Sequence, residues 1–277
     1  MYKRILFALD MEGVNNVVGT PYSGLSTDNE QYPIATHQAA LEINAAADAL
    51  FSAGAEKIDL WDNHGGHKYN VPPEELDERI NRIEVDFSRP RMYFAENNNY
   101  DCICFFGYHA MEGTLGGVLA HTMNSKAIQY YKLNGHYIGE VDMDSYIAAS
   151  HGMPSVFFAA GDIACSQAAR ILPEIVTVTT KKEISRNKAI FRDNDELFKE
   201  IREKICYAVQ LDMPVKKLSF PAVMEKSFKR VEDAEKYLAR LHANKINADY
   251  LDDDILGKDA HTVVSTVDSI DEFIICI

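Results

Sequence analysis

The chain has 277 residues, of which 47% are hydrophobic and 25% are charged, so it can bury the core of one large or two smaller domains. The formal net charge of −14 argues against a nucleic-acid partner, because non-specific binding to a polyanion requires a surplus of Lys and Arg. No stretch reaches the roughly 18 consecutive apolar residues of a membrane helix, so we expect no membrane partner.

The N-terminus and the cysteines indicate the compartment. Asp10 and Glu12 interrupt the first apolar run before it is long enough for a signal peptide. The five cysteines form no C-x-x-C pair, and Cys102 and Cys104 lie in an apolar run typical of a buried strand. Reduced core residues are therefore favoured over metal ligands, and we predict a cytoplasmic protein.

The first predicted strand, residues 5–9, runs directly into Asp10 and Glu12 and ends at Gly13. Residues two apart in an extended segment point to the same side, so both carboxylates can face one point. Burying two like charges together is costly unless a cation neutralises them or one of them takes a proton. The stretch indicates a metal site, with a solvated turn after a strand as the alternative.

Helix and strand alternate after a long polar loop. A helix is predicted over residues 36–53 and a strand over 56–61, which suggests a right-handed crossover and a parallel sheet. The carboxyl ends of the two strands should then lie at the same edge of that sheet. His64 follows the second strand closely.

Further candidate ligands follow the next elements. A buried strand over 100–106 is followed by His109, and the glycine-rich segment 112–123 contains His121. Asn134 and Gly135 predict a hairpin, and Glu140 follows it at the start of a helix over 141–150. The other elements predicted along the chain are an acidic helix over 73–80, a minor strand over 83–87, strands over 155–160, 175–180 and 218–226, and helices over 162–172, 195–209 and 231–244.

These elements predict an α/β fold with three layers around a mostly parallel mixed sheet. The sequence around Met213 and Pro214 suggests a domain boundary. We expect a metal-binding catalytic domain over residues 1–213 and a smaller α+β portion over residues 214–277.

Carboxylate and imidazole groups collect at the predicted strand ends: Asp10, Glu12, His64 and His109, with Glu140 at the junction of hairpin and helix. Ligands of open parallel sheets bind just outside the carboxyl ends of the strands. Two Zn²⁺ ions would balance the three carboxylates if a bridging hydroxide completed neutrality. This balance favours a two-metal hydrolytic centre over one structural ion, which prefers a closed set of four ligands.

Seven segments resemble, in the same order, the zinc-dependent D-aminopeptidase family, and the resemblance covers roughly residues 3–190. They are LDMEG (9–13), LEINAA (41–46), WDNH (61–64), GYHA (107–110), GGVLAHTM (116–123), the junction of Gly139 and Glu140, and ISR (184–186).

This resemblance implies a zinc-dependent aminopeptidase that hydrolyses the amide bond next to the free amino terminus of short peptides. It implies two zinc ions per subunit, with Asp10 bridging them. Glu12 and His64 would complete one site, and His109 and Glu140 the other. It also implies a ring-shaped homo-oligomer, a decamer of two stacked pentamers.

His121 corresponds to the catalytic histidine that is described in that family as the nucleophile. Other roles stay open, because a dinuclear zinc centre lowers the pKa of its bound water towards ~7 and hydroxide is then an adequate nucleophile. His121 would act as a general base, as a cation that stabilises the oxyanion, or only as a loop histidine. Paired metals also suit another amide or a phosphoester, and a non-catalytic metal-binding assembly protein is a further alternative.

The sequence departs from the family pattern at Ala8, where serine is common, and at Asp142 and Asp144, where less acidic residues are expected. The two aspartates either cap a helix N-terminus or face the pocket and select an amino-bearing substrate. Four other histidines are expected to be structural or on the surface: His37, His67, His136 and His151. Of these, His67 is the likeliest spare ligand, because it lies three residues after His64.

Overall fold

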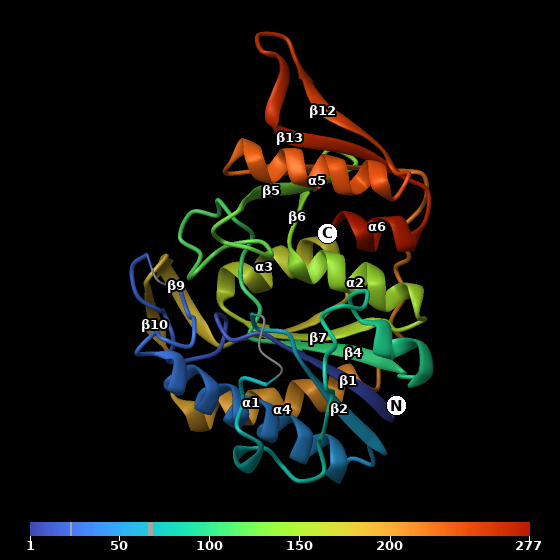
Figure 1. Cartoon of the computed structure of the whole chain (residues 1–277). Coiled ribbons are helices and arrows are strands. Elements are labelled where there is room, and N and C mark those ends of the chain that lie inside the picture. The colour runs from blue at the N-terminus through green and yellow to red at the C-terminus, as the bar shows by residue number, and fades with distance from the viewer. Residues whose placement is uncertain (23, 66–68) are drawn as a thin grey trace.

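The computed structural model describes residues 1–22, 24–65 and 69–277, and its centre is a six-stranded sheet (Figure 1). The strand order is β3-β2-β1-β4-β7-β8, and every pairing is parallel. The strands are β1 (Arg4–Leu9), β2 (Lys57–Asp62), β3 (Asn81–Arg82), β4 (Cys102–Phe106), β7 (Ser155–Ala160) and β8 (Val176–Thr179).

Helices cover both faces of this sheet, α1 (Tyr32–Ser52) and α4 (Asn194–Ala208) on one side and α2 (Glu140–Ser150) and α3 (Asp162–Ile171) on the other (Figure 1). Alternate residues of β1 therefore enter different cores. Ile5 packs with the residues of α1 and α4, and Leu6 packs with those of α2. Both faces are apolar because both are covered, as in other parallel sheets. The predicted three-layer α/β class is confirmed.

Five other strands form a separate antiparallel sheet with the order β12-β13-β11-β5-β6, so they do not join the parallel strands in one mixed sheet as predicted. Its strands and the two helices near it are β5 (Ile128–Leu133), β6 (His136–Ile138), β11 (Ala222–Phe228), β12 (Asn247–Asp253), β13 (Gly257–Val267), α5 (Val231–Ala243) and α6 (Ile270–Cys276). Because β5 pairs with β11, this sheet contains strands from both sides of the predicted boundary at residue 213. The boundary itself stays a prediction.

Several short elements differ from the sequence-based expectation. The predicted acidic helix is a single 3-10 turn, η1 (Pro73–Glu75), and the minor strand lies earlier, as β3. A further 3-10 turn, η2 (Tyr93–Asn97), and a hairpin of β9 (Lys181–Ser185) and β10 (Lys188–Phe191) were not predicted. The five cysteines are free, and Cys102 and Cys104 are buried in β4 as predicted.

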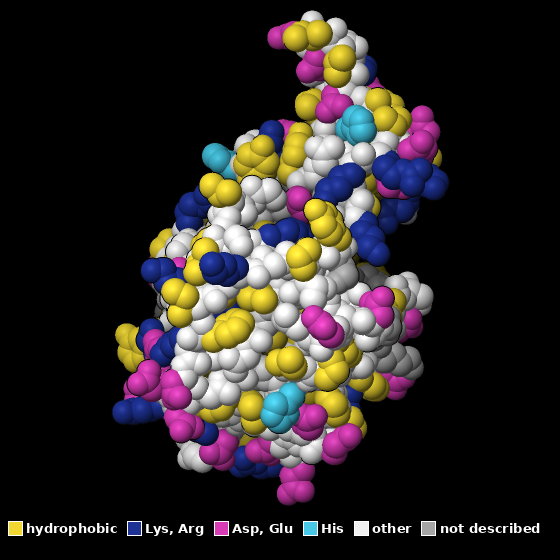
Figure 2. Space-filling model, turned by 90° about the vertical axis from the view of Figure 1, so that its left-hand side faces the viewer, with side chains coloured by type: hydrophobic (Ala, Val, Ile, Leu, Met, Phe, Trp, Pro, Cys, Tyr) yellow, Lys and Arg dark blue, Asp and Glu magenta, His cyan; other side chains and the backbone are white. Residues whose placement is uncertain are grey.

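The hairpin of β12 and β13 projects from the body of the molecule (Figures 1 and 2). Its tip carries two apolar side chains, Ile255 and Leu256, which are 93% and 69% exposed. Within the described residues, no helix is long and apolar enough to cross a bilayer.

Glu42 is a fully buried acid in α1. Its Oε1 accepts hydrogen bonds from the backbone N of Asn15 at 2.8 Å and from Nε2 of Gln38 at 3.0 Å. Its Oε2 has no partner among the described residues. Burial raises the pKa of Glu42 to about 7 despite these bonds, so the ionised carboxylate costs free energy in the folded protein.

We expect Glu42→Gln to raise the free energy of unfolding at about pH 8 by roughly 1 to 3 kcal/mol. The folded pKa of Glu42 lies above the unfolded value, so the cost of ionisation is fully present above about pH 7. It is relieved as the pH falls towards the unfolded pKa near 4.5. Urea unfolding of both proteins at about pH 8 and about pH 5 measures the gain. An equal gain at both values would contradict this account.

Candidate metal centre

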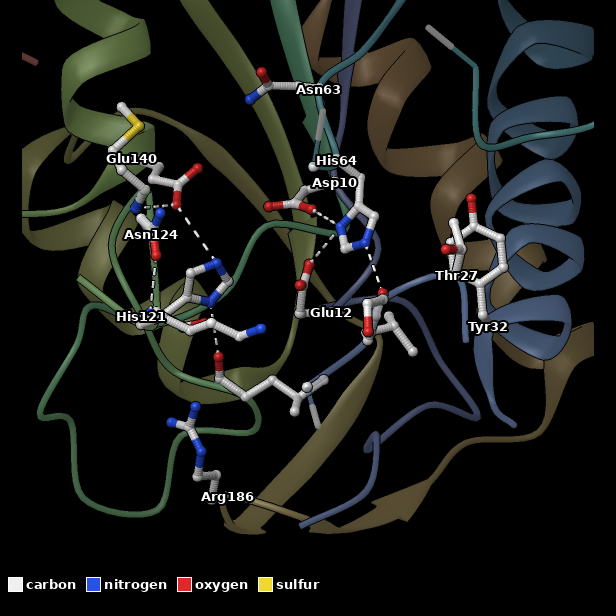
Figure 3. A pocket seen from close by; sticks show the side chains of 18 of the residues that line it. Asp10, Glu12, Thr27, Tyr32, Asn63, His64, His121, Asn124, Glu140 and Arg186 are labelled. Carbon is white, nitrogen blue, oxygen red and sulfur yellow. Dashed lines mark hydrogen bonds and ion pairs between the residues drawn. The ribbon is translucent and has the colours of Figure 1, made fainter. Parts of the chain in front are cut away.

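Three neighbouring strands and one helix bring the predicted ligands together beside a cavity of about 540 Å³, and four of them line it: Asp10, Glu12, His64 and Glu140 (Figure 3). His109 is not among the lining residues. Asp10 and Glu12 follow β1, and His64 follows β2. His109 follows β4, and Glu140 is the first residue of α2. All five side chains are buried. The parallel register of β2, β1 and β4 thus places their carboxyl ends side by side, as the sequence predicted.

The first group of ligand atoms belongs to Asp10, Glu12 and His64, and these atoms lie within 4.8 Å of one another. His64 Nδ1 is 2.7 Å from Asp10 Oδ1 and 3.1 Å from Glu12 Oε2 (Figure 3). An imidazole nitrogen and two carboxylates are ligands that zinc accepts.

The second group belongs to His109, His121 and Glu140, again within 4.8 Å. Glu140 Oε1 is 3.4 Å from His109 Nε2 and 3.9 Å from His121 Nε2. The two imidazole rings are stacked, with centroids 3.7 Å apart. His121 therefore lies at the second group, beside His109 and Glu140.

Asp10 connects the two groups. Its Oδ1 faces His64 Nδ1 at 2.7 Å, and its Oδ2 faces His109 Nε2 at 3.3 Å. Each carboxylate oxygen is thus directed to a different group, which is the arrangement of a carboxylate that bridges two cations.

Backbone carbonyls determine which ring nitrogen carries a hydrogen in each of the three histidines. His64 Nε2 lies 2.9 Å from Leu25 O, and His121 Nδ1 lies 2.9 Å from Leu119 O. His109 Nδ1 lies 3.1 Å from the carbonyl of the residue that follows it. A carbonyl only accepts, so each of these nitrogens carries a hydrogen, and the nitrogen that faces the carboxylates is the one available for a metal or a further proton.

His109 Nε2 is the best indicator that the site binds a cation. It is buried and has no hydrogen-bond partner among the described residues, because its contacts with Asp10 and Glu140 are long and poorly aligned. A buried nitrogen without a partner is costly in a folded protein. A metal ion between the carboxylates would satisfy it, so the residues present fit the predicted cation.

The histidines of the site keep the neighbouring carboxylates ionised. Burial favours neutral Asp10, but His109 and His64 outweigh it and hold the pKa of Asp10 well below its usual range. Burial opposes ionisation of Glu140 too, yet His109 lowers the pKa of that carboxyl to about 2. Asp10 and Glu140 are therefore ionised near neutral pH, as metal binding requires.

Two glycines let β1 and β4 end close together. A Cβ atom at Gly13 would lie 2.0 Å from Tyr108 O, and one at Gly107 would lie 1.9 Å from Asp10 O. Gly107 also has a φ of +69°, which favours glycine. This close approach sets Asp10 beside His109.

Lys181 of β9 anchors the loop after β1, and sequence reasoning missed it. Its buried Nζ donates hydrogen bonds to the backbone O of Glu12 at 2.6 Å, of Val14 at 2.8 Å and of Val17 at 2.6 Å. Nothing in the local sequence distinguishes Lys181 from the exposed Lys182 that follows it. Only the position of the β9–β10 hairpin buries it.

Asp142 and Asp144 do not face the cavity, because both are buried and neither lines it. The interpretation that they select an amino-bearing substrate is therefore wrong. Asp142 accepts a hydrogen bond from Gly139 N at 2.6 Å and so caps α2, as the alternative predicted. Asp144 accepts hydrogen bonds from Arg91 and, at 2.7 Å, from the hydroxyl of Tyr108.

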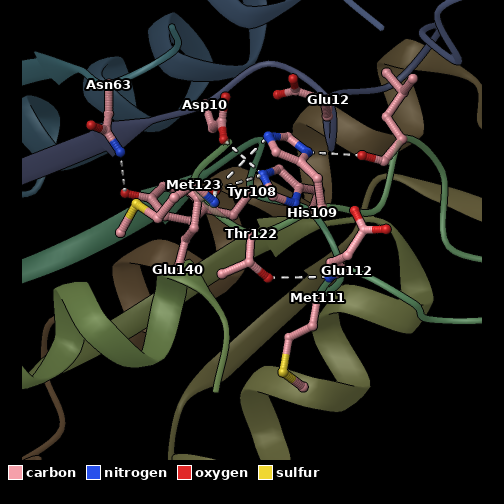
Figure 4. A network of polar contacts seen from close by, with 12 residues as sticks. Asp10, Glu12, Asn63, Tyr108, His109, Met111, Glu112, Thr122, Met123 and Glu140 are labelled. Atoms are coloured by element: carbon pink, nitrogen blue, oxygen red, sulfur yellow. Dashed lines mark hydrogen bonds and ion pairs between the residues drawn. The ribbon is translucent and has the colours of Figure 1, made fainter. Parts of the chain in front are cut away.

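Tyr108 extends this polar network towards the metal centre. Its hydroxyl also accepts a hydrogen bond from Asn63 Nδ2 at 3.4 Å (Figure 4). Tyr108 and Asn63 immediately precede His109 and His64, so the network holds the backbone next to one ligand of each group. Asn63 lay within a recognised motif, whereas no sequence signal marked Arg91.

We expect Asp142→Ala to lower the free energy of unfolding by about 1 kcal/mol, because Gly139 N loses its capping acceptor. Asp142→Asn keeps an acceptor oxygen and should cost less. Urea unfolding measures both, and metal analysis should give unchanged content. Loss of bound metal in the alanine variant would show that Asp142 acts on the centre rather than on the helix.

Of the four histidines predicted to be structural or on the surface, three lie within the described residues. His37 is exposed and pairs with Glu75 at 2.6 Å, and His136 is exposed on β6. His151 directly follows α2. His67, the predicted spare ligand, lies outside the described residues.

Comparisons with known proteins identify the family and the fold of the chain. A family model described as D-aminopeptidase matches residues 3–252. The chain is 24% identical over 220 residues to a D-aminopeptidase of Bacillus subtilis (strain 168). The aligned stretch covers 79% of this chain and 78% of that protein. A solved structure, described as Zn-dependent D-aminopeptidase DppA from Bacillus subtilis, a self-compartmentalizing protease, has the same fold. It matches with a TM-score of 0.83 and 21% identity over 98% of this chain and 94% of that one.

Proposed function

The chain belongs to the D-aminopeptidase family, and on that premise we propose that it is a zinc-dependent aminopeptidase of short peptides that contain D-residues. It would hydrolyse the amide bond next to the free amino terminus. The observation that carries the proposal is the pair of three-ligand groups joined by Asp10. A single structural ion would need only one closed group of ligands.

We assign two zinc ions to each subunit, with Asp10 as the bridging ligand. Glu12 and His64 complete one site, and His109 and Glu140 complete the other. The buried, unpartnered Nε2 of His109 supports this assignment. When bound, two zinc ions supply Lewis acidity towards the carbonyl and lower the pKa of a water molecule.

His121 is the residue that we assign to proton transfer. Its Nδ1–H is held by Leu119 O, so Nε2 is the nitrogen left to exchange a proton, and it lies 3.9 Å from Glu140 Oε1. His121 also lines the cavity and is partly exposed there. It can take a proton from water and return it to the leaving amine as a general base and then an acid. Its imidazolium form would also stabilise an oxyanion.

The direct test combines metal analysis with a parallel substrate screen. Purified protein should hold two zinc ions per chain and should hydrolyse D-alanyl-glycine faster than L-alanyl-glycine. A phosphoester such as p-nitrophenyl phosphate should be a poor substrate. Preference for the phosphoester would support a different two-metal hydrolase, and two bound ions without any turnover would support a metal-binding assembly protein.

We further propose a cytoplasmic, ring-shaped homo-oligomer, a decamer by resemblance. The five free cysteines support the compartment. The self-compartmentalizing description of the solved relative supports the assembly, as do the exposed apolar side chains of Ile255 and Leu256 at the tip of the projecting hairpin. Light scattering coupled to size-exclusion chromatography measures the subunit number.

A further inference from the structure

Arg91 lies in the cavity of the metal centre, but the ligand assignment gives it no role. It lies between β3 and η2, and it lines the same cavity as Asp10, His64 and Glu140. Its side chain is 20% exposed, so most of it is covered by protein.

Three contacts fix the guanidinium group of Arg91. Its Nε and Nη2 donate to Asp144 Oδ1 and Oδ2 at 2.5 and 2.8 Å, and its centre lies 4.9 Å from the ring of Trp61. Asp144 is fully buried and is itself held by Tyr108. The orientation of the Arg91 fork is therefore set before any ligand arrives, which reduces the entropy lost on binding.

One edge of this fork remains available. Asp144 occupies the Nε and Nη2 edge, and Nη1 has no hydrogen-bond partner among the described residues. Because Asp144 occupies the other edge, the edge that carries Nη1 is the one left for a ligand in the cavity. Planar N–H donors of arginine match the two oxygens of a carboxylate.

The charge of the cavity also favours an anion. Lys126 and Arg186 line it too, and neither forms an ion pair with any residue that the structure describes. The carboxylates in the lining are the assigned metal ligands, whose charge two zinc ions and a bridging hydroxide would balance. Lys126 and Arg186 would therefore leave the loaded cavity with a positive surplus.

We propose that Arg91 binds the C-terminal carboxylate of the substrate and so restricts the enzyme to short peptides with a free carboxyl terminus. This inference rests on the proposed aminopeptidase function. It adds recognition of the carboxyl-terminal end of the substrate, which the metal centre does not recognise. Arg91 is a specificity-determining residue in this account, and Asp144 is a positioning residue that acts through it.

The test compares D-alanyl-glycine with its amide, D-alanyl-glycinamide, on the zinc-loaded enzyme. We expect kcat/KM of the wild type to be about 10- to 100-fold higher for the acid, the range for a hydrogen bond between charged groups. Arg91→Met should bring this ratio close to unity. Arg91→Lys keeps the charge but loses the fork, and should give an intermediate ratio.

Arg79 offers a matched control. Its Nε and Nη2 contact Asp77 at 2.8 and 2.5 Å and its guanidinium lies 4.6 Å from the Phe51 ring, but it does not line the cavity. Arg79→Met should keep the wild-type ratio. The proposal would be overturned if the wild type had equal kcat/KM values for acid and amide. It would also be overturned if both methionine variants lowered the acid-to-amide ratio of kcat/KM equally.

Two further measurements keep the outcome clear. Circular dichroism shows whether Arg91→Met folds, and if it does not, the wild-type ratio and the lysine variant still decide. Calorimetry on zinc-loaded His121→Ala compares binding of acid and amide without turnover, and tighter binding of the acid is expected. If neither peptide is hydrolysed, the proposed function fails, whereas equal binding of the two peptides refutes the carboxylate site alone.

Discussion

Replacing Asp10 by alanine is expected to abolish the dinuclear centre. Each oxygen of Asp10 faces one ligand group, so the substitution removes a ligand from both proposed sites at once. Zinc content should fall from two ions per chain to less than one. Peptide hydrolysis should fall by about 10³-fold or more, because the metals contribute several kcal/mol of transition-state stabilisation.

Asp59→Asn is the matched control for this experiment. Asp59 is another buried aspartate of the same sheet, but it pairs with Tyr100 and Lys57 in the middle of β2 rather than with the ligands at its end. Zinc analysis of both variants should show loss only in the first. An Asp10→Ala protein with full zinc content would exclude Asp10 as the bridging ligand.

Replacing His121 by alanine should separate turnover from metal binding. If His121 carries protons, as proposed, the variant keeps two zinc ions and loses about 10²- to 10⁴-fold in kcat, the usual contribution of a positioned acid or base. The measurement is steady-state hydrolysis of D-alanyl-glycine together with metal analysis of the same sample. His136→Ala, at an exposed position of β6, serves as the control.

Two other outcomes of the His121 experiment are equally informative. Loss of one zinc ion would make His121 a ligand of the second group, which its 3.9 Å distance to Glu140 permits. Full activity with full metal content would leave it as a loop histidine whose ring only packs on His109.

The convergence of the candidate ligands could be predicted from sequence because the rule that governs it is local. Each of the three strands is short and is followed by a candidate ligand within three residues, and parallel strands align their carboxyl ends, so Asp10, His64 and His109 had to approach one another. Glu140 was predicted from its place after a hairpin with a strong turn signal. Its approach to His109 depends on how α2 packs on the sheet, which the turn signal does not determine.

The supporting contacts could not be predicted, because they join residues far apart in the chain. Asp144 pairs with Arg91, 53 positions away, and a pattern of charges cannot identify that partner. The hairpin of β5 and β6 was predicted, but its partner β11 lies near residue 225 and determines that the second sheet is separate. The β9–β10 hairpin is short, and the residues that it buries are the charged Lys181 and Glu183, so no alternating apolar pattern marks it.

The anchoring of the first loop by Lys181 has a consequence for the order of events during synthesis. The two carboxylates that follow β1 leave the ribosome early, yet the lysine that holds their backbone is 169 residues further along than Glu12. A nascent chain that ends before β9 contains all five ligands but cannot hold the first two in place. Metal uptake should therefore follow completion of the parallel sheet, late in the life of the growing chain.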